Sequence, residues 1–143
     1  MSESNHPDRP TDHAGMVVMS RTECTERLAS TPVGRVAFVA AGEVEVLPVN
    51  YAWDGHSIVF RTTIGAKLEA AAHHAPITFE IDGWDETTRT GWSVLVKGTG
   101  TEVLSEEEAS KLFSTGLRPW ASATERRRWV RIRPDEVSGR KIV

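Results

Sequence analysis

The chain has 143 residues, of which 39% are hydrophobic and 26% charged, and its formal net charge is −3. This length favours one compact domain, and the composition is that of a globular protein, which excludes wholesale disorder. The weak negative charge argues against a general nucleic-acid or membrane binder, and no apolar run approaches the roughly 18 residues that cross a bilayer. Because no basic, hydrophobic leader opens the sequence, a cytoplasmic protein is expected.

The two ends of the chain differ in character. Residues 1–15 are polar, contain two prolines and lack periodicity, which predicts a disordered arm. The folded domain is therefore expected to span residues 16–143. Residues 126–143 carry seven basic and two acidic residues, a local charge of +5 that leaves −8 on the preceding chain. A positive segment on an acidic body suggests an anionic ligand or an interface with an acidic surface.

Strand patterns predominate between these ends. Alternating or apolar segments predict strands over residues 34–41, 43–51, 56–62, 77–82, 92–103, 129–133 and 137–143. Helices are predicted after the capping-box pattern Ser20 to Glu23, over the alanine-rich residues 64–72, and after a second capping box at residues 105–108 that Gly116 closes. Six or seven antiparallel strands with three short helices predict a mainly β protein of the α+β type, a barrel or open roll with capping helices.

Metal binding finds little support in the sequence. The single cysteine, Cys24, cannot form an internal disulfide, and the five histidines have no carboxylate or thiol at ligand spacing. His73 and His74 are predicted to end the helix over residues 64–72, where cations favour the helix dipole. No metal site is predicted.

Residues 60–68 form the most informative segment. A strand ends in Arg61, the hydroxyls of Thr62 and Thr63 follow, and a helix is expected at once, with Lys67 in its first turn. Backbone N–H groups at a helix N-terminus, two hydroxyls and two cations can converge on one phosphate. An ordinary helix cap with two solvated charges explains the spacing equally well. The GxxxxGK[ST] spacing of a Walker loop is absent.

Seven short motifs follow one another along the chain. They are Gly34-Arg35-Val36-Ala37-Phe38, Pro48-Val49-Asn50-Tyr51, Phe60-Arg61-Thr62 with Gly65 and Lys67-Leu68, Phe79-Glu80-Ile81-Asp82, Gly91-Trp92-Ser93-Val94, Pro119-Trp120 and Gly139-Arg140. In this order they resemble the landmarks of pyridoxamine 5′-phosphate oxidase-like flavin-binding proteins. The resemblance implies a six-stranded antiparallel split β-barrel, a homodimer, and a flavin, usually FMN, bound where the two subunits meet.

The resemblance also implies a set of cofactor-binding residues. Arg61 and Lys67 match the family's phosphate ligands, and Thr62 and Thr63 match the loop that supplies further donors. Asn50 and Tyr51 match the strand segment that lies along the flavin ring.

Further cofactor contacts are implied by the second half of the chain. Trp92, Ser93 and Val94 match the strand opposite the flavin ring, and Trp120 and Arg140 match positions that reach the partner subunit's cofactor. Ordinary strand packing also explains the strand positions. Helix packing and surface charge likewise explain Trp120 and Arg140.

Taken with these residues, the resemblance implies an FMN-dependent oxidoreductase that acts on a small molecule. A deazaflavin coenzyme is the other candidate for its cofactor. Two alternatives stay open: a flavin carrier without turnover, and the same barrel holding haem. The sequence identifies no acid or base, and it lacks the substrate-phosphate residues of a true pyridoxamine-phosphate oxidase. Arg131, Arg133 and Arg140 are the best candidates for holding an anionic substrate or the partner's flavin phosphate.

Overall fold

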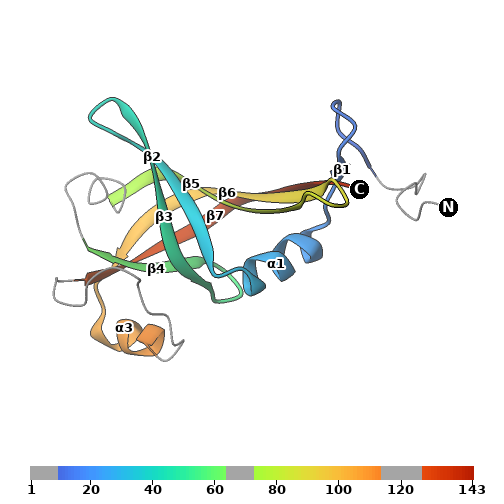
Figure 1. The fold of residues 1–143 in the computed structure, drawn as a ribbon. Coiled ribbons are helices and arrows are strands. Elements are labelled where there is room, and N and C mark those ends of the chain that lie inside the picture. The colour runs from blue at the N-terminus through green and yellow to red at the C-terminus, as the bar shows by residue number, and fades with distance from the viewer. Residues whose placement is uncertain (1–9, 64–72, 114–126) are drawn as a thin grey trace.

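A single antiparallel sheet dominates the computed structural model, which describes residues 10–63, 73–113 and 127–143 (Figure 1). The elements are β1 (Val17–Val18), α1 (Arg21–Ser30), β2 (Val33–Ala40), β3 (Glu43–Trp53), β4 (Ile58–Thr63), β5 (His73–Asp85), β6 (Thr90–Val103), α3 (Glu106–Phe113) and β7 (Arg127–Ile142). No helix in these ranges is long and apolar enough to cross a membrane. The predicted helix over residues 64–72 lies outside the described residues. So does Gly116, the predicted end of the helix that follows residues 105–108.

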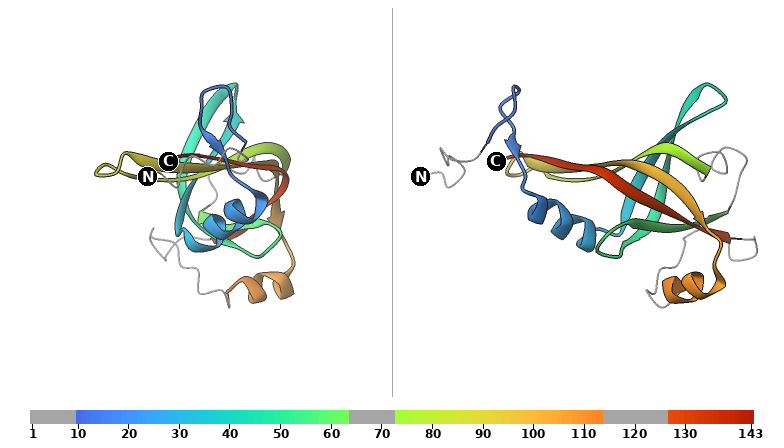
Figure 2. Two further views of the ribbon diagram at one scale, coloured as in Figure 1. Left: turned by 90° about the vertical axis from the view of Figure 1, so that its right-hand side faces the viewer. Right: turned by 180° about the vertical axis from the view of Figure 1, so that it is seen from behind.

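The sheet closes on itself. Its strands lie in the order β1-β7-β4-β3-β2-β5-β6, and an additional pairing of β6 with β7 joins the ends of a ring that contains β2 to β7. All pairings are antiparallel. The expected six-stranded antiparallel split barrel is therefore confirmed, with the two-residue strand β1 added at the edge of β7. Figure 2 shows β5, β6 and β7 extending from the ring as a long ribbon, with α1 beneath it.

Alternation along the strands builds the core. Buried side chains such as Phe60, Phe79 and Val94 point into one cluster, and α1 contributes Cys24 and Leu28 to it. Because successive side chains of a strand point to opposite faces, the residues between these positions point outward. We call the face directed away from this cluster the outer face. A smaller cluster contains Val59 and Trp129 from β4 and β7.

The capping box predicted at the start of α1 is present. Ser20 Oγ accepts the Glu23 N–H at 3.1 Å, and Glu23 Oε1 accepts the Ser20 N–H at 3.2 Å. These two bonds satisfy N–H groups that have no partner inside the helix. The helix ends at Ser30, before Pro32, as the sequence predicts.

The second capping box forms only in part. Ser105 Oγ accepts the Glu108 N–H at 3.3 Å, but the Glu108 carboxylate binds Arg131 and not the backbone of the cap.

His73 and His74 differ from expectation, since they begin strand β5, where His73 pairs with Thr101. The predicted helix end at these histidines is wrong because strand pairing with β6 decides their conformation.

The two strands predicted over residues 129–133 and 137–143 are one continuous strand, β7. Pro134 does not interrupt it, because the register of β6 against β7 shifts between Lys97 and Gly98, and Gly98 pairs with Pro134. A Cβ at Gly98 would lie 2.1 Å from the carbonyl oxygen of Arg133. The absence of a side chain at Gly98 therefore permits the close backbone approach at this irregularity.

Residues 10–16 form a tight turn. Asp12 Oδ1 accepts the N–H groups of Ala14 and Met16, both at 2.9 Å, and Thr11 forms a bridge with Val17. The Asp12 carboxylate and backbone hydrogen bonds, such as that from the Asp12 N–H to the Met16 carbonyl, therefore hold this part of the predicted arm. Residues 1–9 lie outside the described residues.

Candidate functional site

The residues predicted to contact a flavin divide between the two faces of the sheet. Tyr51 and Val94 are buried in the core with exposed fractions of 4% and 0%. Their strand neighbours Asn50 and Ser93 therefore point to the outer face. Arg61 follows fully buried Phe60 and points outward in the same way.

Asn50 and Arg61 form the first outer-face group. Tyr51 pairs with Phe60, so the continued antiparallel register puts Asn50 beside Arg61 on the neighbouring strand. Arg61 pairs with Trp129, and the centre of its guanidinium lies 5.9 Å from that indole ring. Asn50 Nδ2 lies 3.5 Å from the carbonyl oxygen of Pro32. A cation and an amide thus share one part of the outer face.

The remaining predicted phosphate ligands are described only in part. The backbone of Thr62 and Thr63 continues β4 and pairs with Arg128 and Arg127. Lys67 lies outside the described residues, as does Trp120. The structure therefore describes the side chain of Arg61 alone among the four predicted phosphate ligands.

Ser93 and Arg140 form the second outer-face group. Ser93 pairs with Arg140 on β7 and with Asp82 on β5. The Arg140 guanidinium already has two partners, since Nε lies 3.2 Å from Asp12 Oδ2 and the terminal N–H donates to the Gly139 carbonyl at 2.9 Å. Arg140 therefore fastens the N-terminal turn to β7.

Between these groups, the outer face carries a carboxylate pair that the sequence does not predict. Arg35 lies 3.1 Å from Glu80 Oε1 and 3.3 Å from Asp82 Oδ2. Burial raises the pKa of Glu80, the adjacent Asp82 carboxyl raises it further, and Arg35 only partly opposes them, so the pKa reaches about 7. The alternation in the sequence shows that Arg35, Glu80 and Asp82 point outward. Only the pairing of β2 with β5 shows that the three charges lie together.

An apolar area adjoins this carboxylate pair. Val39, Val44 and Val46 are 61%, 73% and 57% exposed, and Val39 pairs with Val44 across the β2–β3 hairpin. Figure 1 shows this hairpin projecting beyond the rest of the sheet. Leu95 on β6 is 37% exposed on the same face, where it pairs with Glu80 of the carboxylate pair. We call Val39, Val44, Val46 and Leu95 the outer apolar surface.

Tyr51 has a structural role in the described fold. Its hydroxyl donates to the Leu28 carbonyl at 2.8 Å, and its ring meets Phe79 edge-on at 4.6 Å between centroids. Burial raises the pKa of Tyr51 above its usual value. Tyr51 therefore connects α1 to the barrel and is enclosed by protein.

Trp92 points to the α1 side of the ribbon and not to the outer face. It pairs with Lys141, and the Arg27 guanidinium lies 4.4 Å from the centre of its ring. Trp92 and Ser93 are therefore on opposite faces of β6, so the three predicted positions 92–94 do not form one surface.

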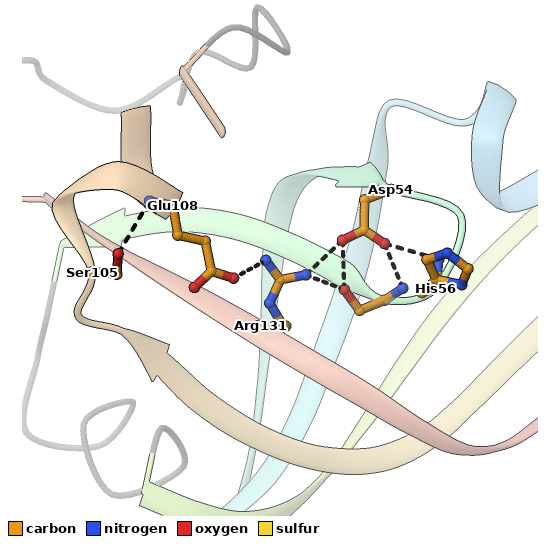
Figure 3. Close-up of polar contacts among 6 residues, drawn as sticks. Asp54, His56, Ser105, Glu108 and Arg131 are labelled. Carbon is orange, nitrogen blue, oxygen red and sulfur yellow. Dashed lines mark hydrogen bonds and ion pairs between the residues drawn. The ribbon is translucent and has the colours of Figure 1, made fainter. Parts of the chain in front are cut away.

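Arg131, a candidate for binding an anionic substrate, is already enclosed by anions (Figure 3). Its guanidinium binds the Asp54 carboxylate, the Ser57 hydroxyl and the Glu108 carboxylate, and its side chain is 12% exposed. Burial acts to raise the pKa of Asp54, but hydrogen bonds from His56 N–H, Ser57 and Arg131 outweigh it and hold that pKa below its usual value. Arg131 therefore joins the β3–β4 turn to α3.

The polar groups on the outer face can bind a ligand, but they do not form an evident acid–base pair. Arg61 offers a cation, and Asn50 and Ser93 offer an amide and a hydroxyl on the outer face. Within the described ranges, no three histidine, cysteine, aspartate or glutamate side chains are grouped to hold a metal ion.

Comparisons with known proteins agree with this fold. The family model described as pyridoxamine 5′-phosphate oxidase matches residues 20–141. An uncharacterised protein of Mycobacterium tuberculosis is 32% identical over 148 residues, covering 100% of this chain and 96% of that protein. The solved FAD binding protein from Mycobacterium smegmatis is 31% identical, with a TM-score of 0.75 over 88% of this chain and 99% of that one.

A second solved structure, a conserved protein of unknown function from Corynebacterium diphtheriae, is 32% identical with a TM-score of 0.74, covering 90% of this chain and 98% of that one. The family match spans nearly the whole described fold, and the relatives align over almost their full lengths. The chain belongs to the pyridoxamine 5′-phosphate oxidase family.

Proposed function

We propose that this protein binds a flavin between the outer faces of two identical subunits and uses it in the oxidation or reduction of a small molecule. The observation that carries the proposal is the pair of polar groups on one face, Asn50 with Arg61 and Ser93 with Arg140. The Mycobacterium smegmatis relative is described as an FAD binding protein, which supports the flavin class. FMN is the member of that class implied by the sequence motifs, and both flavins share the ring and its first phosphate.

The spacing of the two groups supports a shared site. In the sheet, Arg61 on β4 and Ser93 on β6 are separated by β3, β2 and β5, four strand spacings or about 19 Å at the usual strand separation. No single side chain spans that distance. A two-fold arrangement of two chains, face to face, would bring the Ser93 group of one subunit to the Arg61 group of the other.

The outer apolar surface supports a second copy as the partner. Val39, Val44 and Val46 are neighbouring exposed apolar side chains on the β2–β3 hairpin, and a group of this kind favours an interaction surface. The three valines lie on the same face as the two polar groups, further along the β2–β3 hairpin than Asn50, so their burial against a second copy would hold the two outer faces together.

The residues present fit a flavin in chemical terms. Arg61 can hold a phosphate through charge-assisted hydrogen bonds, and Asn50 and Ser93 can bind the polar edge of a flat ring. A bound flavin supplies hydride and electron transfer, while the protein binds and orients it.

A flavin carrier without turnover is the second candidate, and one observation favours it. Arg131 and Arg140, expected to be available for an anionic substrate, are both engaged by carboxylates of the chain itself. An enzyme would reoxidise its reduced flavin faster in the presence of a small organic acceptor than with oxygen alone. A carrier would show no such acceleration with any acceptor.

The binding proposal is tested with two ligands that differ by one phosphate. Replacing Arg61 by Gln should weaken FMN affinity about 10- to 100-fold, because one charge-assisted contact contributes about that much to binding. Riboflavin affinity should stay nearly unchanged. Quenching of flavin fluorescence measures both affinities, and Arg21→Gln, which changes an exposed arginine on α1, is the matched control. Equal losses of FMN and riboflavin affinity would show that Arg61 does not bind the phosphate.

A further inference from the structure

A cavity of about 580 Å³ opens at the end of the β5–β6–β7 ribbon, beside α1. Arg27, Trp92 and Lys141 line it, and the same three residues line a second hollow of about 280 Å³ between α1 and β6. The two hollows together form a concave region on the face of β6 opposite Ser93. We call this region the α1 cavity.

Trp92 forms a flat wall of the α1 cavity. It pairs with Gly83 on β5, and a Cβ at Gly83 would lie 2.7 Å from Trp92 Nε1 and 3.0 Å from two ring carbons. The indole is therefore seated across the bare backbone of Gly83. Trp84, which also lines the cavity, is 72% exposed and adds aromatic surface at the rim.

Arg27 lies over this wall and forms no ion pair with a carboxylate of the described residues. Its guanidinium stacks on the Trp92 indole at 4.4 Å from the ring centre. Glu23, four residues earlier on α1, is the position that usually pairs with such an arginine. Its carboxylate instead accepts the Ser20 N–H and binds Lys141. Among the described residues, no carboxylate lies within ion-pair distance of Arg27.

The stacked guanidinium is suited to a bound anion. Stacking leaves the in-plane N–H groups of an arginine available, and their geometry matches both oxygens of a carboxylate. Asp85 also lines the cavity, and Glu23 and Glu26 line the second hollow. These neighbouring negative charges favour a monoanion over a dianionic phosphate.

We propose that the α1 cavity binds a planar aromatic carboxylate, with its ring beside the exposed Trp84 at the rim and its carboxylate on Arg27, which covers Trp92. This site is distinct from the flavin site proposed above, because Trp92 and Ser93 point to opposite faces of β6. The proposal holds whether or not the protein binds a flavin.

Three probes of one ring size test the proposal by calorimetric titration of the flavin-free, 143-residue chain. They are 1-naphthoate, its neutral analogue 1-naphthamide, and the dianion 1-naphthyl phosphate. 1-Naphthoate should bind at least about tenfold more tightly than the amide, as expected for one charge-assisted contact. Arg27→Gln should remove that preference, whereas Arg21→Gln, an exposed arginine on the same helix, should retain it.

Equal affinity for 1-naphthoate and 1-naphthamide would overturn the proposal, as would tighter binding of 1-naphthyl phosphate or no binding of 1-naphthoate at millimolar concentration. Thermal melting of both variants first establishes that they fold as the parent does. A preference that survives Arg27→Gln in a folded variant would also exclude Arg27 as the anion ligand.

The indole N–H resonances of the five tryptophans report the location. With Trp84→Phe and Trp92→Phe used for assignment, 1-naphthoate should shift the Trp92 signal and leave that of Trp129, beside Arg61, in place. A shift confined to Trp129 would put the ligand on the outer face and contradict the proposal. The titration repeated with FMN present should give the same 1-naphthoate affinity, so failure of the flavin proposal would be seen separately.

Discussion

The hydroxyl of Tyr51 satisfies a carbonyl near the end of α1. Leu28 lies in the last turn of the helix, where carbonyl groups have no partner within the helix itself. Removing the hydroxyl leaves that carbonyl without its donor in a buried place, which costs free energy.

Tyr51→Phe should therefore lower the free energy of unfolding by about 1 kcal/mol, the usual net value of one buried hydrogen bond. Flavin affinity should stay unchanged, because Tyr51 points into the core. Urea denaturation and a flavin titration on the same variant measure both quantities. Unchanged stability together with weakened flavin binding would show that Tyr51 contacts the cofactor.

Glu80 makes stability depend on pH. Its folded-state pKa of about 7 lies above the ordinary value of 4.5, so the folded chain binds a proton more tightly than the unfolded chain does. The stabilising contribution of the protonated form is complete below pH 4.5 and is lost as the pH rises towards and through 7.

Glu80→Gln should remove this loss, since the amide cannot ionise. The variant should match the parent in acid and exceed it in melting temperature at pH 8, as followed by circular dichroism across the pH range. Glu86→Gln changes an exposed acid in the β5–β6 turn and should leave the profile of the parent intact. Identical profiles for the parent and Glu80→Gln would show that Glu80 ionises normally.

At the scale of elements, β7 depends on a residue in another strand. Gly98→Ala should destabilise the protein by about 3 kcal/mol or more, because the new methyl would meet backbone that cannot move without breaking the β6–β7 pairing. Lys97→Ala, on the exposed side of the same strand, serves as the control in chemical denaturation. Similar stability of the two variants would mean that the register shift is not required.

Local signals predicted the elements that local forces determine. The capping box at Ser20 identified α1, and alternation identified the strands of the ring. The continuity of β7 through Pro134 depends on Gly98. The Glu108 carboxylate binds Arg131, which lies 23 residues further along the chain, and so does not complete the capping box. Such long-range contacts leave no trace in a short stretch of sequence.

The candidate site was predictable to a similar degree. Arg61 and Asn50 were found by motif, and alternation alone could have separated Asn50 from Tyr51, and Ser93 from Trp92. The charge cluster of Arg35, Glu80 and Asp82 depends on the register of β2 against β5, which no local pattern specifies.

For the whole molecule, the expected state is a dimer. Light scattering at micromolar concentration should give twice 15.8 kDa. Val46→Glu would put a charge into the outer apolar surface, so it should yield a folded monomer with weakened flavin binding. Leu104→Glu, which alters an 82% exposed side chain outside that surface, should leave both properties unchanged. A monomeric parent would remove the shared site altogether.

The position of β7 has a consequence for how the chain folds. This last strand pairs with β1, β4 and β6, and its Arg140 and Lys141 bind Asp12 and Glu23 near the other end of the chain. A growing polypeptide therefore lacks the strand that closes the ring until residues 127–142 have been synthesised. Contacts of such high sequence separation slow folding and leave strand edges open meanwhile. We expect the nascent chain to remain without a stable barrel, and exposed to chaperones and proteases, until β7 has emerged from the ribosome.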